Sequence, residues 1–298
     1  MSTKLLYLFT RTPLHVGAGA SVGAIDQPIQ RERHTGFPII PGSSLKGSFA
    51  DQWNDTLETQ GEGEKTKKVR GKSVSAWLFG SDDANNAFAG SLNFSEARVL
   101  AFPIRSAKGS YAWITCPLML QRAKRDGVIS SEIPEEPKDG EAIFKSDGPL
   151  ALPGSQIVLE EYCFKLKEGY SSDVAKALAG LVGDELFKSI TDRLVILSNG
   201  MMSHFAVTAC EVAQHVRISD ETGTAEGTGL FNQENVPADT LFYSVLSATA
   251  GRGPAFKDKK PENALHEFAA KLSAANNVFQ FGGDASTGLG FTSVTIQQ

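Results

Sequence analysis

The segment between His15 and Phe49 constrains the fold more than any other part of the chain. It reads HVGAGASVGAIDQPIQRERHTGFPIIPGSSLKGSF, follows a strand-like apolar stretch at 4–10, and is rich in glycine in its first half. Apolar residues then recur at every fourth position from Leu45 to Leu57, which predicts a helix with one buried stripe. A strand, a flexible loop and an amphipathic helix in this order require a sheet against which the helix packs.

The rest of the chain continues this mixture of strands and helices. Strand-like stretches are expected at 4–10, 91–103, 111–120, 156–165, 194–207, 209–218, 240–248 and 277–297, and helices at 43–57, 74–79, 173–194 and 261–275. The expected N-caps of the first and third helices are Ser43 or Ser44 and Ser171 or Ser172. We predict an α+β fold with an antiparallel sheet, and the βαββαβ order of a ferredoxin-like or RRM-like core fits these elements.

Length and composition favour one large domain. We assign residues 1–298 to a single domain with insertions at about 59–72, 121–155 and 208–236. The second insertion holds too few apolar residues for a core of its own, so it is expected to be an excursion from the main one. The third has turn-forming residues at 219–229, which predicts the tip of a β-hairpin.

The charge of the chain is segregated. The formal net charge of −5 argues against a free-standing nucleic-acid binder, which usually carries a basic surplus. Basic residues nevertheless gather at 31–46, 65–72, 122–125 and 252–260, whereas acidic residues concentrate at 130–141. This pattern permits one basic face on an acidic protein, and the competing interpretation is that the lysine-rich loops are merely solvated.

Cysteine usage and hydropathy indicate the compartment. Cys116, Cys163 and Cys210 match no metal-ligand spacing, and buried thiols in a reducing cytosol explain their scatter. The N-terminus lacks the features of a signal peptide, and no apolar run approaches the roughly 18 residues that span a membrane. We therefore expect a cytoplasmic protein without a membrane partner.

Two segments are candidates for binding phosphate. In PGSSLKG at 41–47, backbone N–H groups at a helix N-terminus favour anions, and a bound phosphate would offset the unfavourable position of Lys46 in the first turn. In FGGDASTGLG, the glycines at 282, 283, 288 and 290 can bring backbone N–H groups close to an anion. The alternatives are simple capping by serine and a tight connection between strands.

One loop carboxylate is a candidate for chemistry. Asp26 lies between the glycines and the basic RERH sequence, where it can bind a divalent metal or act as a general base toward a ribose 2′-OH. His15 is close in sequence and can stabilise or protonate a leaving oxygen. The alternatives are a surface ion pair for Asp26 and a buried strand histidine for His15.

Several motifs together resemble the RAMP superfamily of CRISPR effector proteins, and in particular the backbone subunits of type III-B (Cmr) complexes. They are LHVGAGASVGAIDQPIQRERHTGFPIIPGSSLKGSF at 14–49, WLFGS at 77–81, LNFSEARVLAFPIRS at 92–106, ETGTAEGTGLFNQENVPADTLFYSVL at 221–246 and FQFGGDASTGLGF at 279–291. The resemblance spans nearly the whole chain.

The resemblance implies an RRM-like palm and a protruding thumb hairpin. Copies of the chain would stack into a helical filament along a CRISPR RNA, together with other Cmr subunits, and each thumb would press between guide and single-stranded target RNA. The resemblance also implies that the subunit cuts the target with a divalent metal, Mg²⁺ or Mn²⁺. The metal-binding catalytic aspartate of the family falls on Asp26, and His15 and Glu234 match other positions of the same site.

The guide-binding positions of the family fall on the two phosphate-binding candidates. They correspond to Ser43, Ser44 and Lys46, and to Gly282, Gly283, Gly288 and Gly290, and Arg31 in the basic cluster is expected to contact RNA as well. Because base pairing supplies specificity, contacts to the RNA backbone suffice for this role. The alternative functions are a guide-binding scaffold without chemistry and, less favoured, a nuclease that matures the guide.

Overall fold

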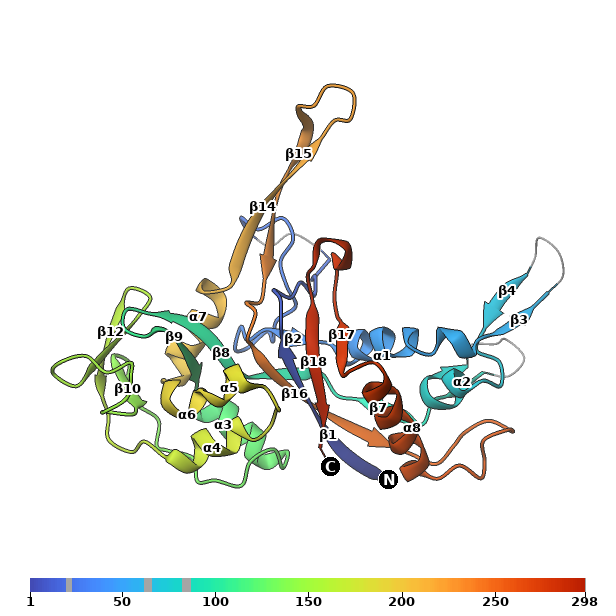
Figure 1. Cartoon of the computed structure of the whole chain (residues 1–298), viewed down its shortest axis with the longest axis horizontal. Helices are drawn as coiled ribbons and strands as arrows, with labels where there is room; N and C mark the ends of the chain where they lie inside the picture. Colours follow the sequence, from blue (N-terminus) through green and yellow to red (C-terminus); the bar gives the residue numbers. More distant parts are fainter. Residues whose placement is uncertain (20–22, 62–65, 82–86, 298) are drawn as a thin grey trace.

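The computed structural model describes residues 1–19, 23–61, 66–81 and 87–297 (Figure 1). Its centre is formed by four antiparallel strands in the order β8 (Ala97–Ser106), β16 (Leu241–Ala248), β1 (Ser2–Thr10) and β18 (Phe291–Ile296). Helix α1 (Gly42–Asp51) lies between β1 and β8 in the sequence, and α8 (Pro261–Ala274) lies between β16 and β18. The predicted mixed α+β fold is confirmed.

Strand β1 is apolar from Leu5 to Phe9 because both of its faces are buried there. Leu6 and Leu8 belong to one hydrophobic cluster, whereas Leu5, Tyr7 and Phe9 belong to a second cluster on the opposite face. Side chains alternate between the two faces of a strand, so burial on both faces selects a continuous apolar run.

Aromatic side chains fix α1 and α8 on one face of the sheet. Phe49 of α1 lies with its ring centroid 5.0 Å from that of Phe268 of α8 and 5.3 Å from that of Phe281. Trp53, just after α1, stacks on Phe268 with a centroid separation of 5.9 Å. These contacts explain part of the spacing of four residues in the sequence, because it places Leu45 and Phe49 on the same side of α1. The helix ends at Asp51, earlier than the predicted 57, and Trp53 is buried just beyond it.

Beyond β8 the sheet continues through a second half of the molecule, in the order β9, β13, β10, β12 and β11. The elements of this half are β9 (Ser110–Thr115), α3 (Pro117–Arg125), β10 (Glu141–Phe144), β11 (Gln156–Leu159), β12 (Tyr162–Leu166), α4 (Ser172–Ala179), α5 (Glu185–Lys188), α6 (Ile190–Arg193), β13 (Leu194–Ile196) and α7 (Asn199–Thr208). The pairs β9–β13 and β10–β12 are parallel, so the prediction of a wholly antiparallel sheet is wrong here.

Three sequence predictions in this half are corrected. The helix expected at 173–194 is broken after Gly180, the C-cap of α4, and a new helical turn begins behind Asp184, which accepts hydrogen bonds from two backbone N–H groups. The extended stretch expected at 194–207 ends after Ile196, because Ser198 caps α7. The insertion at 121–155 supplies part of α3 and all of β10, so it belongs to the core.

The predicted hairpin is present. Strands β14 (Glu211–Ile218) and β15 (Ala225–Asn235) pair antiparallel, and Figure 1 shows them extending away from the rest of the molecule. Leu230 and Val216 face each other across the hairpin with 67% and 49% of their surface exposed. At its base, by contrast, Gln233 and Glu234 are buried. The base is therefore anchored in the body while the outer part is free to meet a partner.

The remaining elements are short. They are β2 (Ile39–Ile40), a 3₁₀ turn at Asn54–Thr56, β3 (Glu58–Gln60), β4 (Lys67–Val69), α2 (Val74–Phe79), β5 (Gly80–Ser81), β6 (Phe88–Ala89), β7 (Leu92–Phe94), β17 (Val278–Gln280) and a 3₁₀ turn at Ala285–Thr287. The insertion predicted at 59–72 falls on β3 and β4, and its residues 62–65 lie outside the described residues. Cys163 is exposed, which corrects the expectation that all three thiols are buried. In the described part of the chain, the helices are too short or too polar to cross a membrane.

Candidate functional site

Three segments that are distant in sequence meet at the base of the hairpin. The loop after β1 forms an antiparallel bridge between Leu14 and Val236 and a parallel bridge between Gln27 and Gln233. The glycine-rich loop at 281–290 joins them because the backbone N–H of Gly283 donates to the carbonyl of His15 at 2.9 Å. This junction brings His15, Asp26 and Glu234 together.

Asp26 is exposed and clamped by a single residue of β15. The backbone N–H of Asp26 donates to Oδ1 of Asn232 at 2.8 Å, and the backbone N–H of Asn232 donates to Oδ2 of Asp26 at 2.9 Å. Nδ2 of Asn232 also donates to the carbonyl of Ala24 at 3.0 Å. The other carboxylate oxygen, Oδ1, has no partner among the described residues, so Asp26 is oriented while one oxygen stays available to a ligand.

His15 is buried, and its ring is fixed by the main chain of the hairpin. Its Nδ1 lies 2.7 Å from the carbonyl oxygen of Glu234. A carbonyl only accepts, so Nδ1 carries the proton and Nε2 holds the lone pair in the neutral ring. A Cβ atom on Gly17 would lie 2.9 Å from Nε2, so the glycine keeps this nitrogen accessible.

His15 and Asp26 line one pocket of about 290 Å³. Its other lining residues are Gly17, Gly19, Gln27 and Pro28. Through the pocket, an imidazole nitrogen and a carboxylate oxygen become available to the same ligand. This arrangement suits proton transfer to and from a phosphodiester, because both groups are held in fixed orientation by main-chain contacts.

Glu234 differs from Asp26, because the fold uses both of its carboxylate oxygens. Oε1 accepts a hydrogen bond from Nη2 of Arg31 at 2.5 Å, and Oε2 accepts one from the backbone N–H of Ile29 at 3.1 Å. The side chain of Glu234 is 4% exposed. These contacts make Glu234 an anchor of the loop that carries Asp26.

Arg31 is likewise occupied within the protein. Besides Glu234, its guanidinium donates to the carbonyls of Gly36 and Ala206 at 2.6 and 2.7 Å and to Sγ of Cys210 at 3.3 Å. Its side chain is 18% exposed. The geometry therefore favours a structural role over the predicted contact with RNA.

Backbone N–H groups of the glycine-rich loop donate hydrogen bonds to carbonyls of the protein itself. Gly283 donates to His15, Gly288 to Ala285 and Gly290 to Pro13. The predicted cradle of free N–H groups is therefore not formed by these three glycines.

Steric crowding explains two of the glycines in this loop. Gly282 and Gly290 have φ angles of 77° and 79°, and a Cβ on them would lie 2.1 Å from the carbonyl of His15 and 2.0 Å from that of Phe281. A tight connection between strands therefore explains both positions. The same loop fixes β15, because Asp284 accepts a hydrogen bond from the side chain of Gln233 at 2.8 Å.

The start of α1 differs from its prediction in one respect. The N-cap is Pro41, no side chain caps the helix, and Ser43 and Ser44 lie inside the first turn. The capping role expected for either serine is therefore wrong. Lys46 is half-buried and forms no ion pair within the described ranges, which leaves its ammonium group available to an anion.

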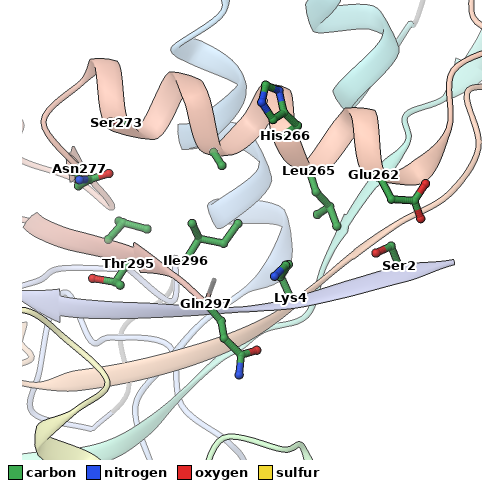
Figure 2. Close-up of a pocket in the computed structure, with 12 residues that line it drawn as sticks. Ser2, Lys4, Glu262, Leu265, His266, Ser273, Asn277, Thr295, Ile296 and Gln297 are labelled. Atoms are coloured by element: carbon green, nitrogen blue, oxygen red, sulfur yellow. The ribbon is translucent and has the colours of Figure 1, made fainter.

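A larger pocket of about 550 Å³ lies away from these residues, between α8 and strands β1 and β18. Figure 2 shows Leu265 of α8, Lys4 of β1 and Ile296 of β18 around it. Its described lining contains none of the residues predicted to cut or bind RNA. The hairpin base therefore remains the better candidate site.

The described residues contain no group of three or more histidine, cysteine or acidic side chains that could hold a metal ion. Asp26 offers one free carboxylate oxygen and Glu234 offers none. Mg²⁺ in phosphoryl-transfer sites is often held by one or two carboxylates together with substrate phosphates and water. The donor set fits such a shared site, in which the protein supplies a minority of the ligands.

Sequence reasoning missed the residues that hold the site together, namely Asn232, Gln233 and Asp284. A signal for them was present, because NQEN at 232–235 places four polar residues at the end of a strand that continues into VP. A buried polar run of this kind requires hydrogen-bond partners from elsewhere in the fold.

Comparison with known proteins gives a consistent result. The family model of the RAMP superfamily matches residues 8–293. The CRISPR system Cmr endoribonuclease Cmr4 of Pyrococcus furiosus is 34% identical over 307 aligned positions, which cover 100% of this chain and 97% of that protein. The crystal structure of oligomeric Cmr4 from the same organism has a TM-score of 0.70 at 29% identity and covers 100% and 98% of the two chains.

A structure of a type III-B Cmr-beta complex bound to cognate target RNA contains a chain of the same fold. It superposes with a TM-score of 0.69 at 20% identity, covering 99% of this chain and 97% of that one.

Proposed function

The chain belongs to the RAMP superfamily, and we propose that it is a backbone subunit of a type III-B CRISPR effector complex that cuts target RNA. In this proposal it binds CRISPR RNA, stacks with copies of itself and with other Cmr subunits, and cleaves the target that pairs with the guide. The relative Cmr4 is named an endoribonuclease, and a structure of it is described as oligomeric. The observation that carries the proposal is the pocket shared by Asp26 and His15.

The strand order supports a ferredoxin-like palm with a thumb. If only the four central strands are counted, the order along the chain, β1-α1-β8-β16-α8-β18, is βαββαβ. In the sheet these strands lie in the order β8-β16-β1-β18, and each neighbouring pair is antiparallel. The protruding hairpin of β14 and β15 is the proposed thumb, and its exposed residues Val212, Val216 and Leu230 are available to the RNA or to a neighbouring copy.

The geometry suggests separate roles for Asp26 and His15 in proton transfer. The free oxygen of Asp26 accepts the proton of a ribose 2′-OH while the 2′-oxygen attacks the adjacent phosphorus and the bond to the 5′-oxygen breaks. When the His15 ring is protonated, its Nε2–H faces the pocket and returns a proton to the departing 5′-oxygen. The products are then a cyclic phosphate and a free 5′-hydroxyl.

The alternative role of the free Asp26 oxygen is to hold a divalent cation instead of acting as the base, and the cation would neutralise charge on the scissile phosphate. The protein's part is to orient Asp26 through Asn232 and the imidazole through the carbonyl of Glu234. Removal of divalent cations by a chelator is expected to stop cleavage.

The test is target cleavage by a complex in which every copy carries Asp26→Asn. We expect the rate to fall by about 10²-fold or more, the scale of general acid–base catalysis, while affinity for guide and target is kept. The matched control is Asp55→Asn, which removes an exposed carboxylate that is paired with Lys271 of α8 and does not line the pocket of Asp26. A normal rate with Asp26→Asn would contradict the catalytic assignment.

A non-catalytic guide-binding scaffold is the second candidate, and the contacts of Glu234 favour it, because both oxygens of this predicted catalytic residue accept hydrogen bonds from the protein itself. The cleavage pattern distinguishes the two. Cuts at regular intervals along the target would tie the activity to the repeated subunit, whereas irregular cuts or none would favour the scaffold.

A further inference from the structure

A second polar pocket, with a volume of about 410 Å³, has Arg31 in its lining. It is formed by the loop before β2 together with the start of β2, by β8 with the residue before it, and by helix α3. Its lining residues are Arg31, Glu32, Arg33, His34, Ile39, Glu96, Arg98, Arg122 and Arg125. Five of these nine residues are arginines and one is aliphatic, so the pocket suits an anion and offers little to an apolar ligand.

The inner wall of this pocket is neutralised within the protein. Arg122 donates to both oxygens of the buried Glu32 at 3.0 and 2.9 Å, and Thr35 donates to Oε2 at 2.7 Å. Burial by itself would raise the pKa of Glu32, but the hydrogen bonds from Thr35 and Arg122 outweigh it and the pKa is lowered. Glu32 therefore stays ionised and holds Arg122 in place.

Arg98 belongs to the same wall. Its Nε lies 3.2 Å from Glu96, and its Nη1 lies 3.5 Å from Asp126. Tyr243 donates to the same oxygen of Asp126 at 2.9 Å, which ties the wall to strand β16. In the inner wall, therefore, the positive charges of the arginines are paired with carboxylates of the protein itself.

The outer wall is different, because its cations have spare capacity. Arg33 is exposed and forms no hydrogen bond or ion pair with the described residues. The side chain of Arg125 is 66% exposed, and among the described residues it contacts only Asp126, through Nε at 3.1 Å, which leaves both of its terminal nitrogens open there. Two guanidinium groups with free donors at the mouth of one pocket form a recognition element for phosphate.

We propose that this pocket binds a backbone phosphate of single-stranded RNA through Arg33 and Arg125. The inference rests on the proposed function for its choice of ligand, because Arg31 lines this pocket and also holds Glu234 at the Asp26 site. Contacts of this kind are independent of sequence, as a guide-directed protein requires.

The test measures binding of the full chain to a fluorescent, unstructured single-stranded RNA at several salt concentrations. Each lost phosphate contact lowers the slope of log affinity against log salt by about 0.7 for single strands. We expect Arg33→Gln and Arg125→Gln each to weaken binding severalfold and to reduce this slope by about that amount, and the double variant to do both further.

The matched control is Arg252→Gln, which removes the same charge from an exposed position in the loop before α8. Its affinity and salt slope are expected to equal those of the unchanged chain. The double variant would overturn the proposal if it bound RNA with the affinity and slope of this control. Failure of the unchanged chain to bind RNA would overturn it too.

Two further arms separate the alternatives. Polyglutamate of matched charge is expected to compete weakly, and competition equal to that of RNA would assign the pocket to an acidic protein and overturn the proposal. Asp26→Asn is expected to keep the full salt slope. Normal cleavage by Asp26→Asn together with weakened binding by the arginine variants would refute the nuclease while leaving the phosphate site in place.

Discussion

Two carboxylates at the base of the hairpin have different roles, although both lie where the same three segments meet. Asp26 is exposed, is clamped through one oxygen and keeps the other free. Glu234 is buried, and both of its oxygens accept hydrogen bonds from the loop that carries Asp26. The difference teaches that the site has an inner layer that holds the loop and an outer layer that meets the ligand. Mutations in the two layers should have different consequences.

Removal of the inner carboxylate should have the largest effect on stability. In Glu234→Ala, Arg31 loses its ionic partner but keeps two carbonyl acceptors, so we expect a loss of about 3 kcal/mol in the free energy of unfolding. Denaturant titration of the full chain measures this loss. Glu221→Ala, in the exposed tip of the hairpin, should change stability by less than about 0.5 kcal/mol. Equal effects from both variants would show that Glu234 does not anchor the loop that carries Asp26.

A methyl group at Gly17 should damage the outer layer alone. The added Cβ would lie 2.9 Å from Nε2 of His15, and the imidazole would have to turn away to relieve the contact. We expect cleavage to fall by about tenfold to a hundredfold with a nearly unchanged melting temperature. Gly47→Ala, where nothing lies within 4 Å of the added atom, is the control. An unchanged rate with Gly17→Ala would argue against a role for Nε2.

Loss of the Asn232 side chain should loosen Asp26 without removing it. Asn232→Ala deletes the acceptor for the Asp26 N–H and the donor to Ala24, but the backbone bond to Oδ2 remains. We expect kcat for target cleavage to fall by about tenfold with little change in KM, because orientation is affected more than binding. Single-turnover cleavage measures this split, and a rise in KM alone would contradict it.

The smallest expected effect concerns pH and the arginine pocket. The pKa of Glu32 is lowered in the folded chain, so its contribution to stability is present above the ordinary value of 4.5 and is lost as pH falls through the folded value. As the pH is lowered from about 6 to about 3, a range around that ordinary value, the melting temperature of Glu32→Gln should fall less steeply than that of the unchanged chain. Parallel curves for the two proteins would show that Glu32 is not coupled to folding in this way.

Local patterns predicted the parts of the fold that local forces determine. The apolar run of β1 and the periodicity of α8 led directly to elements within a residue or two of those observed. The prediction of one helix at 173–194 was wrong because Gly180 ends α4 and Asp184 begins a new helical turn. The spacing of apolar residues continues across this break and therefore does not reveal it.

The roles of the site residues depend on contacts over long sequence distances. The partner of Arg31 is Glu234, and the clamp of Asp26 is Asn232, each more than 200 positions away. The sequence identified Asp26 and His15 as candidates. It could not distinguish the charged residues that pair within the fold from those that are available to bind RNA. The same limit explains Gly282, whose role is set by the carbonyl of His15.

The most direct test compares Asp26→Asn and Glu234→Gln in assembled complexes, with target cleavage and thermal melting measured on the same samples. The account predicts that Asp26→Asn loses cleavage by about 10²-fold or more and keeps its melting temperature, whereas Glu234→Gln lowers the melting temperature. A complex whose copies all carry Asp26→Asn and which still cuts target RNA at the normal rate would contradict the central claim.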